Sequence, residues 1–420
     1  MSSDGRYKAL KGMQDILPPD IYIWQKVENA AREIFSSYGF KEIRPPVVES
    51  TDIFVRSIGE NTDIVEKEMY TFNDKAERSI TLRPEGTASV VRCYVENHLY
   101  NLPSPQKYYY SGPMFRYERP QSGRFRQFYQ IGVESFGSPH PAMDADIISM
   151  LRHFLLRLGL KEVKFQVNSI GCERCRPDYK ESLLAFFSDR LGNLCPDCRR
   201  RYGINPLRIL DCKVERCIEM RADAPRITDS LCHDCRTHFD RLLSLLGILK
   251  VEYIVNPDMV RGLDYYTRTT FEVTSESLGS QNAVAAGGRY DRLVKEFGGP
   301  ETPAIGFAVG MERIVELLKK SVRHEYPAPN LFIANIGDPA GKKSILIADE
   351  LRNKGLWIEL GDNETSLKSQ MRRADKLSAE YVFIIGDDEI NSGKLKWKRL
   401  SDSTNGEISL SEISSFFINK

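Results

Sequence analysis

Apolar residues recur at helical spacing near the start of the chain and give way to alternation further along. From Ile21 to Tyr38 they fall on one helical face, and Gly39 stands where such a helix would end. The sequence FKEIRPPVVES, residues 40–50, then predicts an extended segment, and its tandem prolines favour the edge of a sheet or an interface.

Alternating runs at residues 105–118 and 125–137 flank a short polar loop, so they predict a long β-hairpin. Residues 144–159 predict a helix. After a cysteine-rich interruption the β pattern returns in four stretches, the last of which turns into a helix: residues 252–260, 269–275, 282–294 and 304–320. Beyond a proline-bearing linker, strands and helices alternate to the end, which predicts a separate α/β domain of about ninety residues.

The composition is that of a globular protein with more than one domain. A chain of 420 residues is too long for one ordinary core, so two or three domains are expected. Neither an apolar run of about eighteen residues nor an apolar signal core is present, so we expect no membrane segment and a cytoplasmic location. A formal net charge of +1 neither indicates nor excludes a nucleic-acid partner.

Eight of the nine cysteines form four close pairs: Cys172/Cys175, Cys195/Cys198, Cys212/Cys217 and Cys232/Cys235. In a reducing compartment such pairs are more often metal ligands than disulfides, and eight thiolates suffice for two four-cysteine zinc sites. The alternative is a set of buried or surface thiols without a metal. The sequence leaves open which pair joins which, and we treat Cys93 as a small apolar residue.

The second strand of the predicted hairpin presents two different faces. One is apolar and predicts a contact with the core: Tyr129, Ile131 and Val133. The other carries a ring, an amide, a glycine and a carboxylate: Phe128, Gln130, Gly132 and Glu134. A polar face with a central glycine is either the floor of a pocket, with room for a ligand at the glycine, or a face open to solvent.

Arginines concentrate around the hairpin loop beside Glu118. They are Arg116, Arg119, Arg124 and Arg126. Such a cluster repels itself unless an anion joins it, and a triphosphate or a nucleic-acid backbone supplies that charge. A solvated basic loop is the alternative.

Arg313 falls in the first turn of a predicted helix. A helix N-terminus is electropositive, so an arginine there favours a bound anion beside it, and Gly306 and Gly310 permit close approach. The alternative is that Arg313 reaches into water or pairs with Glu312 or Glu316.

Three further stretches place ligand-binding groups close together. DMVRGLDYYTRTTFEV, residues 258–273, sets a cation, a glycine and two phenols ahead of a strand, which a strand entering a core does not need. In TLRPEGTASV, Glu85 and Thr87 suit an ammonium group, although a helix-capping turn uses the same residue types. In the third stretch two glycines clear space beside a tyrosine: Gly287, Gly288 and Tyr290.

Taken together, these stretches resemble the histidyl-tRNA synthetase family of class II aminoacyl-tRNA synthetases. FKEIRPPVVES is similar to the dimer-forming first motif, with Pro46 at its proline. FRYERPQSGRFRQFYQIGVESFG and GFAVGMERIVELL are similar to the second and third motifs. RGLDYYTRTTFE and GGRYDRLV are similar to the two stretches peculiar to the histidine enzymes, and the resemblance runs from KGMQDILP to the tail.

The resemblance implies an α+β fold in three domains. A catalytic domain built on an antiparallel sheet would occupy residues 1–169 and 246–322, and a cysteine-rich, mainly helical insertion would occupy 170–245 and reach toward the tRNA acceptor arm. A C-terminal α/β anticodon-binding domain would occupy 328–420. Four basic residues on one of its helices would face the anticodon backbone or solvent: Lys368, Arg372, Arg373 and Lys376.

The resemblance also implies a role for each candidate residue. Histidine would be bound by Glu85, Gly86, Thr87, Arg116, Gln130, Glu134, Arg261, Tyr265, Tyr266 and Tyr290. ATP would be bound by Arg116, Glu118, Arg124, Phe128 and Arg313. Arg116, Arg261 and Arg313 would be catalytic, and Arg261 would stabilise the pentavalent α-phosphorus while Mg²⁺ neutralises pyrophosphate. The implied partners are L-histidine, ATP, a histidine tRNA and a second copy of the chain.

Three alternatives remain at this point. One is a synthetase-like regulatory subunit of ATP phosphoribosyltransferase, but that protein lacks the anticodon-binding tail. Another is a class II synthetase for threonine, proline or glycine, against which Glu134 and the pair Tyr265 and Tyr266 argue. The third is a zinc-stapled binding protein, which leaves the convergent arginines unexplained.

Overall fold

A computed structural model describes residues 7–59, 62, 64–120, 123–260, 265–279, 282–321 and 326–418. The chain splits into two compact units, Met1–His324 and Glu325–Lys420. Among the described helices, none is both long and apolar enough to cross a membrane.

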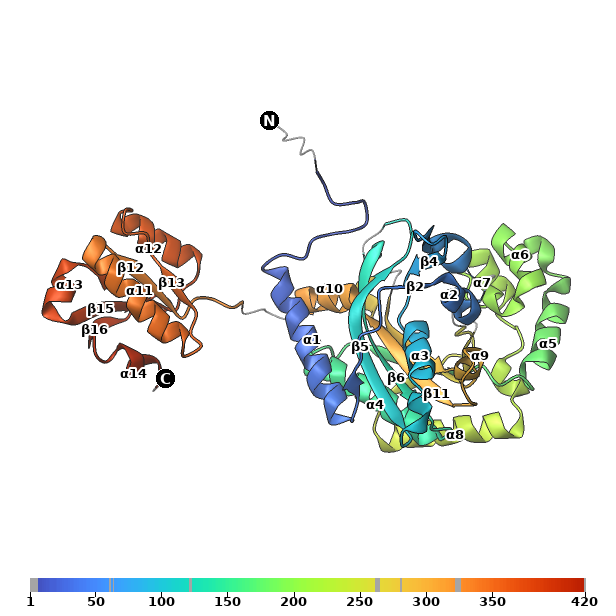
Figure 1. Ribbon diagram of the computed structural model, residues 1–420. Helices are drawn as coiled ribbons and strands as arrows, with labels where there is room; N and C mark the ends of the chain where they lie inside the picture. The colour runs from blue at the N-terminus through green and yellow to red at the C-terminus, as the bar shows by residue number, and fades with distance from the viewer. Residues whose placement is uncertain are drawn as a thin grey trace. The chain divides into compact units, whose positions relative to one another are not determined.

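The larger unit is built on an eight-stranded sheet in the order β1-β5-β6-β11-β10-β9-β7-β8 (Figure 1). The strands are β1 (Lys41–Glu42), β5 (Gln106–Phe115), β6 (Gln127–Phe136), β7 (Lys164–Ser169), β8 (Tyr253–Val255), β9 (Thr267–Thr274), β10 (Ala283–Arg289) and β11 (Ala304–Gly310). The inner pairs are antiparallel, and the pairs at the two edges, β1–β5 and β7–β8, are parallel. The predicted hairpin is confirmed as β5–β6, and the proline-bearing segment contributes β1 at the sheet edge.

Helices cover both faces of this sheet, as the alternation of side chains requires. They are α1 (Asp20–Ser37), α3 (Thr87–Glu96), α4 (Pro141–Arg157), α8 (His233–Ile248), α9 (Leu293–Glu296) and α10 (Met311–Ser321). Ile131 and Val133 of β6 are fully buried in one core with α1, α4, α8 and α10. Tyr108 and Tyr110 of β5 point the other way, into a second core with α3 and α9.

A small three-stranded sheet was not predicted from the sequence. Its order is β2 (Val48–Ser50), β4 (Ser79–Leu82) and β3 (Tyr70–Asn73), and α2 (Thr51–Ile58) follows its first strand. The strands are three or four residues long and mostly exposed, so they carry little of the apolar alternation that marks a longer strand.

The cysteine-rich segment is helical, as expected. It leaves the sheet after β7 and returns before β8, and its helices are α5 (Arg176–Ser188), α6 (Pro196–Ile204), α7 (Glu215–Met220) and the start of α8. A separate small core holds it together, with Leu183, Phe187 and Ile209 fully buried.

The smaller unit has a five-stranded sheet in the order β13-β12-β14-β15-β16. Its strands are β12 (Leu331–Asn335), β13 (Ile358–Leu360), β14 (Tyr381–Ile385), β15 (Lys394–Arg399) and β16 (Asn405–Ser409). Its helices are α11 (Asp338–Arg352), α12 (Leu367–Lys376), α13 (Asp387–Ser392) and α14 (Ile413–Ile418). The predicted strand–helix alternation is confirmed up to β14, and an antiparallel hairpin completes the sheet.

Candidate active site

A pocket over the middle of the large sheet collects most of the predicted site residues. Those that line it are Glu85, Thr87, Arg116, Glu118, Arg124, Phe128, Gln130, Glu134, Tyr265, Tyr266, Tyr290 and Arg313. They come from β6, from the turn before α3, from the hairpin loop, from the residues flanking β9 and β10, and from α10. Gly86 is not among the lining residues, and Arg261 lies outside the described residues.

Arginines form one part of the pocket wall. Arg116 donates from Nε to the Pro84 carbonyl at 2.9 Å, and its guanidinium carbon lies 5.2 Å from the centre of the Phe128 ring. Arg124 pairs with Glu118 at 3.1 Å. Arg313 reaches the pocket rather than bulk water, and burial together with repulsion from Arg124 lowers its pKa. A bound anion would offset both effects.

Glu134 is a buried carboxyl group in the floor of the pocket. Its Oε1 accepts a hydrogen bond from Thr87 Oγ1 at 2.7 Å, and its Oε2 accepts one from the Tyr290 hydroxyl. Burial raises the pKa of Glu134 to about 8; the nearby Glu85 charge adds to the rise, and the two hydrogen bonds oppose it. The group is therefore poised between its neutral and charged forms near neutral pH.

Glu85 caps a helix, which is one of the two uses that the sequence left open, and it also faces the pocket. Its carboxylate accepts the backbone N–H groups of Thr87 at 2.7 Å and Ala88 at 2.8 Å, which caps the first turn of α3. It also lines the pocket, and burial raises its pKa. Capping fixes the carboxylate in place, so it presents a rigid acceptor to the pocket.

Tyr110 lies among the site residues, and the sequence analysis missed it. A Cβ on Gly86 would come within 2.1 Å of its ring, and one on Gly132 within 2.3 Å. The gap predicted for a ligand at Gly132 is therefore filled by Tyr110. Among the described residues its buried hydroxyl has no hydrogen-bond partner. The YYY run at 108–110 was the available signal, but its glycine partners come from other segments.

Other glycines also serve neighbours within the protein. A Cβ on Gly306 would lie 1.9 Å from Glu134 Oε2, so this glycine admits the carboxylate rather than an outside anion. A Cβ on Gly288 would lie 2.6 Å from the Thr269 carbonyl and 2.9 Å from the Tyr266 ring. Gly288 therefore makes room for the adjacent strand and for Tyr266, and not for Tyr290 as the sequence suggested.

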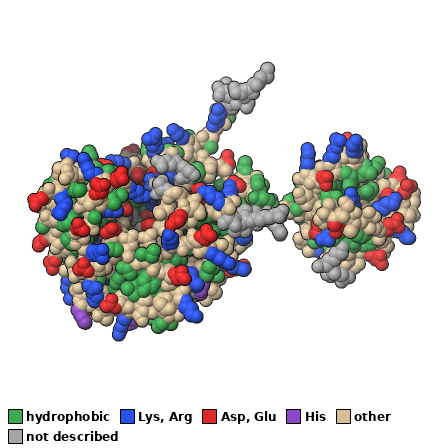
Figure 2. Space-filling model, turned by 180° about the vertical axis from the view of Figure 1, so that it is seen from behind, with side chains coloured by type: hydrophobic (Ala, Val, Ile, Leu, Met, Phe, Trp, Pro, Cys, Tyr) green, Lys and Arg blue, Asp and Glu red, His purple; other side chains and the backbone are tan. Residues whose placement is uncertain are grey.

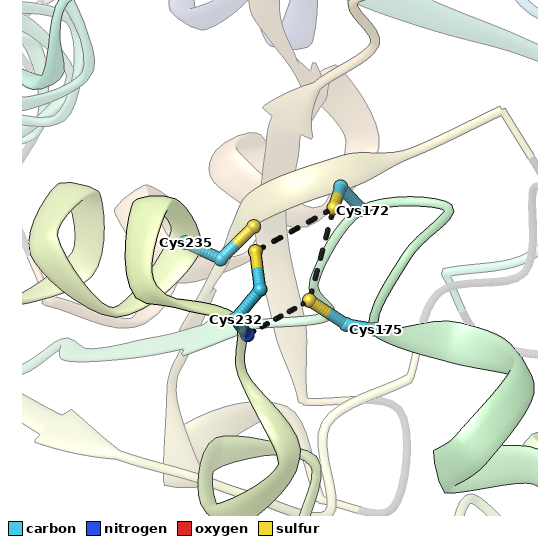
Figure 3. Close-up of side chains that lie close together, drawn as sticks. All are labelled: Cys172, Cys175, Cys232 and Cys235. Carbon is cyan, nitrogen blue, oxygen red and sulfur yellow. Dashed lines mark hydrogen bonds between the residues drawn. The ribbon is translucent and has the colours of Figure 1, made fainter.

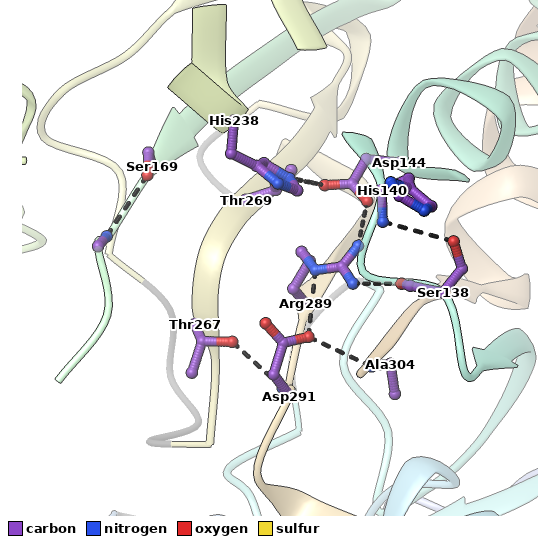
Figure 4. Close-up of polar contacts among 11 residues, drawn as sticks. Ser138, His140, Asp144, Ser169, His238, Thr267, Thr269, Arg289, Asp291 and Ala304 are labelled. Carbon is purple, nitrogen blue, oxygen red and sulfur yellow. Dashed lines mark hydrogen bonds and ion pairs between the residues drawn. The ribbon is translucent and has the colours of Figure 1, made fainter. Parts of the chain in front are cut away.

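A buried polar network surrounds Arg289, the residue before Tyr290, and was not predicted from the sequence (Figure 4). Arg289 is fully buried; it donates to Asp144 Oδ1, to the Ser138 carbonyl, and from Nε to Asp291 at 3.1 Å. Asp144 Oδ2 also accepts from Thr269 Oγ1 at 2.6 Å and lies 2.8 Å from His238 Nε2. The network joins α4, α8, β9 and β10 next to the pocket.

Replacing Arg289 by methionine should destabilise the protein strongly, because the buried Asp144 carboxylate loses its arginine partner and keeps only Thr269 and His238. We expect a loss of about 3–5 kcal/mol in the free energy of unfolding, measured by urea titration with circular dichroism. The double variant Arg289→Met/Asp144→Asn should regain a large part of that loss. A single variant within about 1 kcal/mol of the parent would contradict the pairing.

The eight clustered cysteines form two groups of four. The outer cluster is Cys172, Cys175, Cys232 and Cys235, and the inner cluster is Cys195, Cys198, Cys212 and Cys217. The first pair in sequence thus joins the fourth, and the second joins the third. In the outer cluster the four side chains point toward one another from the loop between β7 and α5 and from the start of α8 (Figure 3).

The sulfur geometry fits a tetrahedral metal rather than disulfides. All eight thiols are free, and within each cluster the four sulfurs lie within 4.8 Å of one another. The Sγ–Sγ distances are 3.7 Å for Cys172–Cys175 and 3.9 Å for Cys195–Cys212. Four sulfurs at about 2.3 Å from a zinc ion would be about 3.8 Å apart. Backbone N–H groups also donate to sulfur, as from Cys232 to Cys175 at 3.2 Å, and such bonds favour a thiolate.

A family model described as histidyl-tRNA synthetase matches residues 12–174 and 212–314. The chain belongs to the histidyl-tRNA synthetase family. A second model, described as an anticodon binding domain, matches residues 331–420. The predicted family and class II synthetase fold are therefore confirmed.

Individual relatives agree with this placement. The chain is 52% identical to the histidine–tRNA ligase of Thermodesulfovibrio yellowstonii over 97% of each chain. It is 51% identical to that of Syntrophotalea carbinolica over 98% of each chain. The apo histidyl-tRNA synthetase of S. aureus is similar in structure, with a TM-score of 0.83, 36% identity, and coverage of 98% of this chain and 99% of that one.

Proposed function

We propose that the pocket is where this chain, a histidine–tRNA ligase, activates its amino acid. The carboxylate of histidine attacks the α-phosphorus of ATP in line and pyrophosphate leaves. The resulting adenylate passes histidine to the 3′ end of its tRNA. The observation that carries the proposal is the buried Glu134 carboxyl in the floor of a pocket whose wall holds Arg116, Arg124 and Arg313. Positioning and charge supply the catalysis, so no covalent enzyme intermediate is required.

Histidine lies against the carboxylates and tyrosines in this proposal. Glu85, Thr87 and Gln130 receive the ammonium group. The Oε1 atom of Gln130 is buried and has no hydrogen-bond partner among the described residues, so it is an acceptor that a donor can fill. Glu134 and Tyr266 bind the imidazole nitrogens. Tyr265 and Tyr290 close the pocket beside them, and the centres of their rings lie 5.7 Å apart.

ATP lies along the arginines. Phe128 stacks on adenine, and Arg116, Arg124 and Arg313 bind the phosphates. Arg261, named from the sequence alone, stabilises the α-phosphate in the transition state. Mg²⁺ enters with the triphosphate, and the Glu118 carboxylate at this wall is a suitable oxygen ligand for it.

The remaining parts of the chain serve tRNA binding. We propose the domain boundaries stated above, with the insertion at 170–245 directed to the acceptor arm and 328–420 to the anticodon. Lys368, Arg372 and Lys376 are exposed on α12 and can follow a phosphate backbone. On the visible face of both units, basic side chains are interspersed with acidic ones (Figure 2), so tRNA contact rests on local groups rather than on net charge.

Three further features complete the proposal. Both cysteine clusters hold structural zinc, because their sulfur spacing matches four-thiolate coordination. The chain forms a homodimer through the segment around Pro46, and it works in the cytoplasm. Zinc here stabilises the insertion and contacts no substrate.

Methylated histidines test whether both imidazole nitrogens are bound. Two isomers each carry a methyl group on one ring nitrogen, so each removes one hydrogen bond to Glu134 or Tyr266. We expect both to lower kcat/KM in ATP–pyrophosphate exchange by at least about 10³-fold, because a buried polar group is left unpaired and the methyl group clashes. If kcat/KM for either isomer lay within about tenfold of the value for histidine, the pocket would not recognise the nitrogen that carries the methyl group.

A further inference from the structure

The outer cluster stands where the insertion joins the catalytic sheet. Cys172 follows the end of β7 closely, and Cys232 and Cys235 lie at the start of α8, which packs against α4 (Figure 3). Cys175 and Cys232 are 57 residues apart in the sequence, yet the backbone N–H of one donates to the sulfur of the other. The cluster therefore closes the base of the whole insertion.

The two residues before Cys172 form backbone hydrogen bonds with Arg268, whose own backbone is strained. Ile170 N donates to the Arg268 carbonyl at 2.8 Å, and Arg268 N donates to the Gly171 carbonyl at 2.8 Å. Arg268 has φ +51°, a left-handed conformation that a residue with a side chain keeps only when its surroundings impose it. Tyr266 of the histidine pocket lies two residues away, so its backbone depends on this clamp.

Arg176 makes a second connection to the same tyrosine. It directly follows Cys175 in the first turn of α5, and its Nη2 donates to the Tyr266 carbonyl. Gly171 allows the Cys175 side chain to lie close to its backbone. Its φ is +65°, and a Cβ at this position would lie 2.7 Å from Cys175 Cβ. Arg176 is thus held by the cluster and holds Tyr266 in turn.

A third connection runs from Cys235 along α8. His238 lies one turn further and contacts Asp144, whose other carboxylate oxygen pairs with Arg289. Arg289 is the neighbour of Tyr290, which donates to Glu134. Hydrogen bonds, an ion pair and short stretches of backbone therefore link the outer cluster to both Tyr266 and Tyr290.

The inner cluster differs in its surroundings. Cys198 and Cys217 are fully buried, and they pack with Leu183, Phe187 and Leu194 of the insertion's own core. Its sulfurs join segments only 17 and 22 residues apart. Its contacts within this core stabilise the insertion locally.

We infer that zinc in the outer cluster positions Tyr266 and Tyr290, so that its presence sets the affinity for histidine. The inner zinc has no such effect. Arg176 is a positioning residue in this scheme and touches no substrate. The inference rests on the proposed zinc sites and on the proposed histidine pocket, and its test separates its own failure from theirs.

The experiment compares three cysteine-to-serine variants of the full chain, purified without chelator. They are Cys232→Ser/Cys235→Ser in the outer cluster, Cys212→Ser/Cys217→Ser in the inner cluster, and Cys93→Ser on α3 as the matched control. Elemental analysis gives zinc per chain, and equilibrium dialysis gives Kd for histidine without ATP and for ATP without histidine. Zinc returned to metal-depleted parent protein provides a rescue.

We expect two zinc ions per chain in the parent and in the Cys93→Ser control, and one in each double variant. The outer variant should raise Kd for histidine about tenfold or more, while its Kd for ATP and both constants of the inner variant stay within about twofold. An outer variant that loses zinc but keeps its histidine affinity would overturn the inference and leave the zinc sites standing. A parent without zinc would overturn both, and a parent that binds no histidine would overturn the proposed pocket.

A second comparison keeps the inference falsifiable if the outer variant fails to fold. Arg176→Met should retain two zinc ions and still raise Kd for histidine about tenfold, because it cuts one connection and spares the metal site. The control is Lys180→Met, which removes an exposed cation from the same helix. If Arg176→Met kept the parent's affinity for histidine, the connection through Tyr266 would be ruled out.

Discussion

Glu134→Gln is expected to lower kcat/KM for histidine in ATP–pyrophosphate exchange by about 10³-fold, equivalent to about 4 kcal/mol. Glutamine has almost the same shape, and its amide can still bond to Thr87 and Tyr290 in the free protein. What it loses is the negative charge that, in the proposed binding mode, accepts an imidazole N–H in a water-poor pocket. Hydrogen bonds to charged groups are the strong ones, and burial removes the competition of water.

The pH dependence gives this variant a second readout. Burial and the Glu85 charge raise the pKa of Glu134 to about 8, so the free protein gains the carboxylate as pH rises through that value. Since kcat/KM reports groups of the free enzyme, it should increase from about pH 7 to about pH 9 in the parent, one unit on either side of that pKa. In Glu134→Gln this rise should disappear. Glu33→Gln, an exposed change on α1, should keep the parent profile; equal profiles in all three proteins would contradict the role of Glu134.

Arg116→Ala is expected to reduce kcat for adenylation by about 10²–10³-fold, with a smaller change in KM for ATP. The Arg116 guanidinium is fixed by the Pro84 carbonyl and lies near the Phe128 ring. Its charge is therefore already positioned in the pocket before substrate binds. A preorganised charge stabilises the transition state more than the ground state. The loss should therefore fall on kcat.

Arg119→Ala is the matched control for this prediction. Arg119 belongs to the same hairpin loop, but it is exposed and is not among the residues that line the pocket. Its adenylation kinetics should stay within about twofold of the parent, because it is far less desolvated. If the two variants lost activity equally, the loop would act through its net charge and not through the placement of Arg116.

Local patterns predicted the elements that carry their own signal. The helical spacing of residues 21–38 corresponds to α1, and the two alternating runs correspond to β5 and β6, because each buries one face against a large core. Arg313 was expected in the first turn of a helix and lies there, at the pocket wall. Similarity to the family motifs, and not periodicity, identified histidine as the amino-acid substrate.

Other features depend on residues far apart in the sequence. Arg289 and Asp144 are 145 positions apart, so no local sequence pattern predicts their ion pair. Tyr110 occupies space left by Gly86 and Gly132, which belong to a turn and a different strand. The glycines misled the sequence analysis for the same reason: a missing side chain shows that something approaches closely, but not whether it is a ligand or a neighbouring strand. Only the fold shows that the first cysteine pair joins the fourth and that the second joins the third.

The most direct test of the central claim is amino-acid-dependent ATP–pyrophosphate exchange with the purified full-length chain. Each of the standard amino acids is offered separately, with Mg²⁺ and without tRNA. We expect exchange with histidine and only background with every other amino acid, because the proposed binding mode pairs both imidazole nitrogens and the ammonium group. Exchange with another amino acid at a comparable rate, or none with any amino acid in a folded protein, would contradict it.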